Sequence, residues 1–214
     1  RDLLKLYEGI DKKKLQENMK YWLEAIMPVC DKYDINMCVH PDDPPYPVFG
    51  LPRIIGTAED IQWMLDAVPN KHNGLTFCAG SFSAGEHNDC VAMAKQFADR
   101  THFVHLRSCY IFPNGNFTEA SHLGGRADLI ELCRIFEKAE QEGKCNSGRR
   151  LPMRVDHGMT FTDKPGGVFD ESTHGHNAGY TLLGRMFAMG QIQGVIATVD
   201  RELGIKYKQP GFYD

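Results

Sequence analysis

The chain has 214 residues, of which 42% are hydrophobic and 24% are charged, and its formal net charge is −4. This is the composition of a globular protein with enough apolar residues for a sizeable core. The net negative charge and the lack of a basic run argue against nucleic acid or another polyanion as a partner. No apolar run approaches the roughly 20 residues that span a membrane, and no signal peptide is visible, so we expect no membrane association.

Seven cysteines are scattered along the chain without a Cys-x-x-Cys pair, so neither a zinc ribbon nor a thioredoxin motif is indicated. Several of them lie in apolar patterns, where cysteine behaves as a small buried hydrophobic residue. We therefore expect a reducing compartment, the cytoplasm.

Amphipathic and apolar segments alternate along the chain. An apolar face at three- and four-residue spacing predicts a helix over residues 15–33, and Thr57 with Asp60 forms a capping-box-like start for a helix that ends near Val68. Further helices are expected over residues 89–99, 128–143, 180–189 and 191–203. Short apolar runs predict strands over residues 35–39, 75–78, 102–106 and 151–155. Polar segments predict loops at residues 113–116, 145–150 and 160–176.

Strands that alternate with helices indicate an α/β fold with parallel strands joined by right-handed crossovers. No G-x-G-x-x-G follows a strand, so a dinucleotide-binding fold has no direct support. Four strands cannot close a (β/α)₈ barrel, which typically needs about 250 residues. The chain opens at Arg1 on what reads as an interior segment. We therefore expect residues 1–214 to be a single domain, the C-terminal four β/α units of a (β/α)₈ TIM barrel whose N-terminal half is missing.

Four residues of the types that bind metals stand at equivalent positions, each at the end of one predicted strand: His40, Cys78, His105 and Asp156. Taken singly, Cys78 fits a core thiol and His105 fits a hydrogen-bonded core histidine. A carboxylate that ends a buried strand needs a partner or a metal ion. The repetition predicts one catalytic metal ion with mixed nitrogen, sulfur and oxygen ligands and an open position for substrate or water.

His157, directly after Asp156, is the predicted acid/base, because an imidazole exchanges protons near neutral pH. Adjacent strand residues point to opposite faces, so both side chains reach one site only if the chain bends there. We expect Gly158 to permit this bend. Tyr180 opens a predicted helix, and from the residues alone simple packing is its preferred role.

Arg107 lies two residues after His105 and therefore points to the same side of the strand. Its guanidinium is suited to bidentate binding of a substrate carboxylate. The alternative is a salt bridge to Asp42, Asp43 or Asp156. Asp42 and Asp43 themselves fit hydrogen bonds that order their loop better than they fit catalysis.

Six segments, in this order and spacing, resemble the D-mannonate dehydratase family over nearly the whole chain: His40–Pro45, Gly50–Ile54, Cys78–Ser81, His105–Ser108, Met153–Gly158 and Gly179–Arg185. The resemblance implies a xylose-isomerase-like (β/α)₈ barrel that uses Mn²⁺ or Fe²⁺. It implies conversion of D-mannonate to 2-keto-3-deoxy-D-gluconate and water in glucuronate breakdown, by a cytoplasmic homo-oligomer. The segment between Gly158 and Tyr180 is longer than is usual in the family.

The resemblance also implies roles for individual residues. It makes the four strand-end residues the metal ligands, in agreement with the set above, and His157 and Tyr180 the catalytic residues. We expect the substrate to be bound by Arg107, Asp42, Ser81 and Arg185. Two alternatives stay open: a divalent-metal sugar isomerase or epimerase of the same barrel type, and a non-catalytic protein with a closed tetrahedral metal site.

Overall fold

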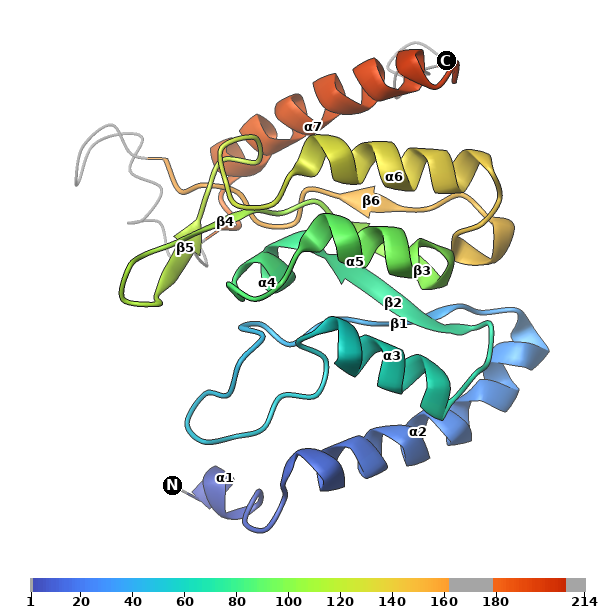
Figure 1. Cartoon of the computed structure of the whole chain (residues 1–214), viewed down its shortest axis with the longest axis vertical. Coiled ribbons are helices and arrows are strands. Elements are labelled where there is room, and N and C mark those ends of the chain that lie inside the picture. Colours follow the sequence, from blue (N-terminus) through green and yellow to red (C-terminus); the bar gives the residue numbers. More distant parts are fainter. Residues whose placement is uncertain (1, 162–178, 207–214) are drawn as a thin grey trace.

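The computed structural model describes residues 2–161 and 179–206, and it has the expected α/β architecture (Figure 1). Four parallel strands form one sheet in the order β1-β2-β3-β6. Their bounds are Met37–Val39 (β1), Asn73–Cys78 (β2), Thr101–His105 (β3) and Met153–Arg154 (β6). All six residues of β2 are buried, as expected for a central parallel strand that is covered on both faces.

The fourth strand is shorter than predicted. Residues 151–155 were expected to be extended, but only Met153 and Arg154 pair with β3, opposite Val104 and His105. In the part of the chain that the structure describes, β6 and β1 are edge strands, each with one neighbour. The sheet is therefore open, and a short edge strand limits unpaired backbone groups.

The helices lie in chain order from α2 at one end of the molecule to α7 at the other (Figure 1). The main ones are α2 (Lys12–Tyr33), α3 (Ala58–Ala67), α5 (Cys90–Phe97), α6 (Leu129–Gln141) and α7 (Leu182–Glu202). Short elements complete the list: α1 (Asp2–Lys5), α4 (Ala79–Ser83), η1 (Ala98–Arg100) and η2 (Asn146–Gly148).

Side-chain caps explain where the helices start. Thr57 accepts a hydrogen bond from Asp60 N at 3.2 Å, which confirms the predicted start of α3. Asp89 and Asp128 accept backbone N–H groups in the same way at α5 and α6. Such caps satisfy N–H groups that have no partner inside the helix.

Between β3 and α6 the chain forms a hairpin where only a polar loop was expected. The hairpin consists of the antiparallel strands β4 (Cys109–Ile111) and β5 (Phe117–Glu119), with Tyr110 opposite Thr118. Gly115 adopts φ +81° in its turn, a conformation that glycine tolerates without strain. The hairpin carries Glu119 back to the sheet.

The two predicted C-terminal helices are one continuous helix, α7. Gly190, at the predicted break, costs a helix only about 1 kcal/mol relative to alanine. The buried face formed by Ala188, Ile192, Val195 and Val199 runs past it and favours an unbroken helix. The irregular loop expected at residues 160–176 lies almost wholly outside the described residues.

α7 also corrects the expectation about membrane-length segments. By length and composition it is apolar enough to cross a membrane, and it is the single such helix among the described residues. In this structure α7 packs against α6, and Ile192, Val195 and Val199 belong to the core.

The core lies between the sheet and these helices and includes a cluster of aromatic rings. Phe77 of β2 contacts Phe82 and Phe136, with ring centroids 5.3 and 5.2 Å apart, and none of the three is measurably exposed. Interlocked rings of this kind hold β2 and α6 together. The strand ends that leave this core therefore start from fixed positions.

Candidate metal and acid–base site

Four predicted ligands meet at the C-terminal edge of the sheet. His40 follows β1, Cys78 ends β2, His105 ends β3 and Asp156 comes two residues after β6. In the parallel register, Cys78 lies directly opposite His105. Because parallel strands all end at the same edge, local strand pairing is enough to bring these side chains together.

The ligand atoms lie at distances that suit one ion. Nε2 of His40 is 3.2 Å from Nδ1 of His105, and Nδ1 of His105 is 3.4 Å from Oδ2 of Asp156. Sγ of Cys78 is 4.0 Å from the same Asp156 oxygen. One ligand atom from each of His40, Cys78 and His105 lies within 4.8 Å of the other two. Two donors bound at about 2.1 Å to one ion are separated by about 3 to 3.5 Å.

The chemistry of the donors also fits a divalent ion. Nδ1 of His40 lies 2.7 Å from the carbonyl oxygen of Pro41, which can only accept, so Nδ1 carries the hydrogen and Nε2 faces the cluster with its lone pair. Ser81 donates a hydrogen bond to Cys78 Sγ at 3.2 Å. Two imidazoles, one thiolate and one carboxylate suit zinc, iron or manganese.

Asp156 supplies the negative charge of the cluster. Burial raises the pKa of its carboxyl group, but the hydrogen bond and charge of His105, together with His157 and Arg154, outweigh burial and lower the pKa to about 2. Nη2 of Arg154 lies 3.0 Å from Oδ1, and the Asp156 residue is 5% exposed. The carboxylate is therefore ionised and ready to bind a cation at neutral pH.

The chain bends at Asp156 itself. Its φ is 57°, in the left-handed region that an aspartate tolerates better than most residues. The bend was expected at Gly158. A glycine is needed there for a different reason, since a Cβ would lie 2.5 Å from the carbonyl oxygen of Gly184. Gly158 thus allows the loop to pack against the start of α7.

His157 links two further side chains. Its Nδ1 lies 2.8 Å from Oε1 of Glu119, and its Nε2 lies 2.9 Å from the hydroxyl of Tyr180. The predicted pair of His157 and Tyr180 is therefore brought together, 23 residues apart in sequence. Nε2 is also 3.9 Å from Oδ2 of Asp156, so His157 and Tyr180 adjoin the four predicted ligands.

Arg107 is buried beside this pair, with 3% of its side chain exposed. Its Nη1 lies 2.5 Å from Asp43, and its Nε and Nη2 donate to Glu119 at 2.9 and 2.7 Å. The salt bridge to Asp43, which was the alternative interpretation, is present. Binding of a substrate carboxylate by Arg107 stays a prediction.

Three more predicted substrate residues lie near the cluster with other partners. Asp42 accepts hydrogen bonds from the backbone of Ile54 and Ile55, both at 2.8 Å, so it orders its loop. Ser81 contacts the Cys78 sulfur, and the guanidinium of Arg185 lies 5.7 Å from the Tyr180 ring centroid. Substrate contacts for Asp42, Ser81 and Arg185 stay predictions.

Glu119 contacts His157 in this site but was not among the residues predicted from the sequence. A signal for the turn was present, because Asn114-Gly115 is a typical hairpin-turn dipeptide and follows the largely apolar residues 109–112. That pattern predicts a hairpin but does not say where its second strand ends in space.

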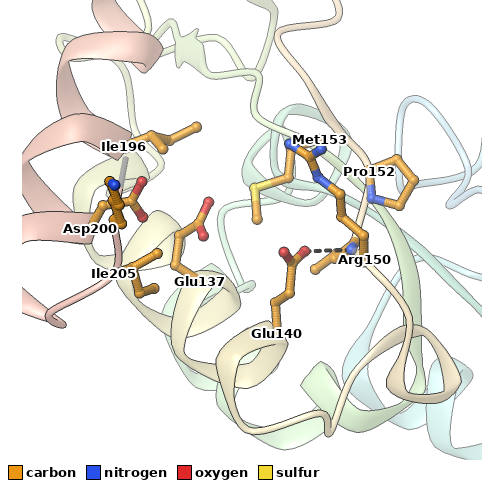
Figure 2. A pocket seen from close by; sticks show the side chains of 10 residues that line it. Glu137, Glu140, Arg150, Pro152, Met153, Ile196, Asp200 and Ile205 are labelled. Atoms are coloured by element: carbon orange, nitrogen blue, oxygen red, sulfur yellow. Dashed lines mark hydrogen bonds between the residues drawn. The ribbon is translucent and has the colours of Figure 1, made fainter. Parts of the chain in front are cut away.

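Two cavities lie beside β6, the edge strand of the sheet. One, of about 580 Å³, adjoins the site and is lined by Asp156, Arg185 and apolar residues of α7. The other, of about 590 Å³, lies at the start of β6, where Glu137 and Asp200 face it with Glu140 and Arg150 (Figure 2). The second cavity is at the opposite end of the strand from the ligand cluster.

Comparisons with known proteins point to one family. The model of the D-mannonate dehydratase family matches residues 1–206. Mannonate dehydratase 2 of Agrobacterium fabrum is 40% identical over 203 residues, which are 94% of this chain and 49% of that protein. Mannonate dehydratase of Chromohalobacter salexigens is 36% identical over 206 residues, 96% of this chain and 51% of that protein.

A solved structure agrees with these sequence matches. The crystal structure of mannonate dehydratase from Streptococcus suis serotype 2 superimposes with a TM-score of 0.79 at 26% identity. The match covers 96% of this chain and 55% of the other. This chain therefore spans about half the length of the curated relatives it matches.

Proposed function

The chain belongs to the D-mannonate dehydratase family, and on this premise we propose that its site dehydrates D-mannonate to 2-keto-3-deoxy-D-gluconate and water. The observation that carries the proposal is the convergence of His40, Cys78, His105 and Asp156 beside His157 and Tyr180. Because the chain spans about half of its relatives, the activity is proposed for the protein that contains this site and a complete fold around it.

The fold proposed for that protein is a (β/α)₈ TIM barrel, of which this domain supplies the C-terminal four units. Two observations support it. The parallel sheet is open at β1 and β6 within the described residues, and its functional side chains gather at the C-terminal ends of the strands, as in barrels of this type. The partial coverage of each relative is consistent with the remaining units lying elsewhere in a longer protein.

The proposed cofactor is Mn²⁺ or Fe²⁺, held by His40, Cys78, His105 and Asp156. When bound, the ion supplies Lewis acidity, which stabilises the negative charge that develops on the substrate carboxylate. The protein side chains would hold the ion and keep its ligand atoms in position. Asp156 balances the charge of the cation, and the hydrogen bond between His40 and Pro41 aims Nε2 at the cluster.

Dehydration needs a proton to leave the carbon next to the carboxylate and a hydroxyl to leave the carbon after it. The electron pair of the broken C–H bond forms a double bond as the C–O bond breaks, and the hydroxyl leaves as water after it takes up a proton. The resulting enol becomes the 2-keto acid. His157 exchanges the proton through Nε2, in contact with the Tyr180 hydroxyl 2.9 Å away.

The remaining features of the proposal follow the family. The seven cysteines are free, which supports a reducing compartment and hence the cytoplasm. A place in glucuronate breakdown and a homo-oligomeric state stay predictions, as does the lack of a membrane or nucleic-acid partner.

The experiment is an assay of the purified protein for 2-keto-3-deoxygluconate from mannonate, with Mn²⁺ and with a chelator, together with metal analysis. We expect product with Mn²⁺ and none with the chelator. His157→Asn should keep the metal and lose about 10²- to 10⁴-fold in kcat, the usual contribution of a general acid or base. His87→Asn, which changes an exposed histidine, is the matched control.

Four outcomes would contradict the proposal in different ways. A protein that forms no keto acid under Mn²⁺ is not a dehydratase. Interconversion of sugars instead would favour the isomerase alternative, and a metal without an open coordination position would favour a binding protein. A His157→Asn variant with wild-type kcat would remove His157 from the chemistry.

A further inference from the structure

Glu119 connects the acid–base pair to a buried arginine. Its Oε1 lies 2.8 Å from Nδ1 of His157, and its carboxylate accepts hydrogen bonds from Nε and Nη2 of Arg107. We infer that Glu119 is a positioning residue, which holds His157 in the tautomer with hydrogen on Nδ1 and so leaves Nε2 free to receive a proton. The inference deepens the proposed function and, for its effect on turnover, rests on it.

The chemistry of the contact determines the tautomer. A neutral imidazole has one N–H donor and one acceptor nitrogen, and an ionised carboxylate can only accept. Burial raises the pKa of Glu119, but hydrogen bonds from His157 and Arg107 outweigh it and keep the pKa below its usual value. The nitrogen that faces Glu119 therefore carries the hydrogen, and the lone pair is on Nε2, toward Tyr180.

Arg107 fixes the orientation of Glu119. Nε and Nη2 of the planar guanidinium donate hydrogen bonds to the Glu119 carboxylate, and Nη1 donates one to Asp43. The arginine cannot move aside easily, because its stem lies against Gly80, where an added Cβ would come within 2.3 Å of Arg107 Cγ and Cδ. One carboxylate oxygen is thus presented to His157 at a fixed angle.

The alternative explanation is that Glu119 only balances the charge of Arg107. That role would need no contact with His157, and Asp43 already gives the guanidinium one carboxylate. The 2.8 Å contact to Nδ1, on the ring edge opposite Tyr180, is what a positioning role requires. In the Ser-His-Asp triad of serine proteases, loss of the equivalent carboxylate leaves the geometry intact but gives the wrong tautomer and costs about 10⁴-fold in kcat.

The first test is Glu119→Gln, which keeps the shape of the side chain and an oxygen for Arg107. Its amide N–H group can donate to Nδ1, so the tautomer with hydrogen on Nε2 becomes populated. We expect kcat to fall about 10²-fold or more, with KM within about threefold and the bound metal unchanged. Glu131→Gln is the matched control, because Glu131 is also a partly buried glutamate bonded to an arginine, Arg134.

The second test reads the tautomer directly and needs no activity. Nitrogen NMR of ¹⁵N-histidine-labelled protein distinguishes the two ring nitrogens, and the His157 signals among the nine histidines are identified by their loss in His157→Asn. We expect hydrogen on Nδ1 in the wild type and in Tyr180→Phe, and a shift toward Nε2 in Glu119→Gln.

The outcomes separate this inference from the proposed function. A wild-type protein with hydrogen on Nε2 overturns the inference, whether or not it dehydrates mannonate. A Glu119→Gln variant with the wild-type tautomer or wild-type kcat also overturns it. If the wild type forms no keto acid but carries hydrogen on Nδ1, the proposed function fails while the positioning role stands. If Glu119→Gln does not fold, the wild type and Tyr180→Phe decide the tautomer.

Discussion

The two ends of the β6 strand hold buried or partly buried carboxylates in opposite situations. At its C-terminal end, Asp156 faces His105, His157 and Arg154, and these partners lower its pKa to about 2 despite burial. At its start, burial and then the neighbouring Asp200 and Glu140 raise the pKa of Glu137 to about 7. Burial acts in the same direction at both ends, so the sign of the net change is determined by the partners.

In the described part of the chain, the carboxylates at the start of β6 lack the strong pKa-lowering partners that Asp156 has at the other end. Glu137 and Asp200 face one cavity, and no hydrogen-bond partner among the described residues reaches Oδ1 of Asp200, which is 5% exposed (Figure 2). Arg150 is the cation that lowers the pKa of Glu137, but its effect is the smallest of those acting on this group. A buried carboxylate with hydrogen-bonded or cationic partners, such as Asp156, therefore stays ionised to lower pH, whereas burial without such partners raises the pKa of Glu137 and Asp200.

The largest expected effect comes from removing the charge at the paired end. Asp156→Asn keeps the size of the side chain but removes the anionic oxygen that lies 3.4 Å from His105. We expect Mn²⁺ affinity to fall more than about 100-fold, since even residues that only support a ligand cost about 10- to 100-fold. Titration with Mn²⁺ measures this, and Asp99→Asn, an exposed aspartate, is the control. An unchanged affinity would remove Asp156 from the ligand set.

A smaller effect is expected when the charge is removed at the unpaired end. Because the folded-state pKa of Glu137 is about 7, above its value in the unfolded chain, ionisation costs stability as the pH rises from about 4.5 to 7. Glu137→Gln removes that cost. We expect it to stabilise the protein at pH 8 by about 1 kcal/mol, a value reduced for solvent screening of a partly exposed group.

Urea unfolding at pH 8 and pH 5 measures this stability difference. The gain should be lost at pH 5, where Glu137 is protonated and neutral in the folded protein. Glu142→Gln is the matched control, because that glutamate is bonded to Lys144 at 2.7 Å and its pKa is lowered by that bond. Equal gains at both pH values would show that Glu137 is not the group responsible.

The smallest expected effect comes from removing Arg150, whose positive charge slightly lowers the pKa of Glu137. Arg150→Gln should raise the pKa of Glu137 further above about 7, by less than about one pH unit, because Arg150 is a minor influence on that group. Carbon NMR of the labelled glutamate carboxyl groups follows this titration. Arg149→Gln, at the neighbouring arginine that is bonded to Asp34, should leave the titration unchanged. A fall in the pKa would contradict the sign assigned to Arg150.

Local signals in the sequence were enough for most elements of the fold. The cap at Thr57 and the apolar spacing along residues 15–33 predicted helices that α3 and α2 confirm. These signals work because capping and amphipathicity act between residues three or four positions apart. The predictions were wrong where contacts between residues distant in sequence determine the structure. At Gly190, for example, a continuous buried face of α7 outweighs the weak helix-breaking tendency of glycine.

The meeting of four side chains at one edge of the sheet could be predicted, while the contacts around them could not; their role as metal ligands stays a prediction. His40, Cys78, His105 and Asp156 were identified by their positions at strand ends, and parallel pairing is sufficient to gather them. The contact of Glu119 with His157, 38 residues apart, depends on how the hairpin folds back over the sheet. Likewise, the close approach of α7 to Gly158, which leaves no room for a Cβ, depends on a contact with residues distant in the chain.

By itself, the sequence determined the alternation of strands and helices, the residues that end each strand and a resemblance to one family, because periodicity and chain order are properties of neighbouring residues. The tertiary structure alone decided which carboxylates have partners. It placed Asp156 beside Arg154 and two histidines and Glu119 between Arg107 and His157, and it left Asp200 facing a cavity. The physical reason is that electrostatic compensation depends on distances of a few ångströms between residues that are far apart in the chain.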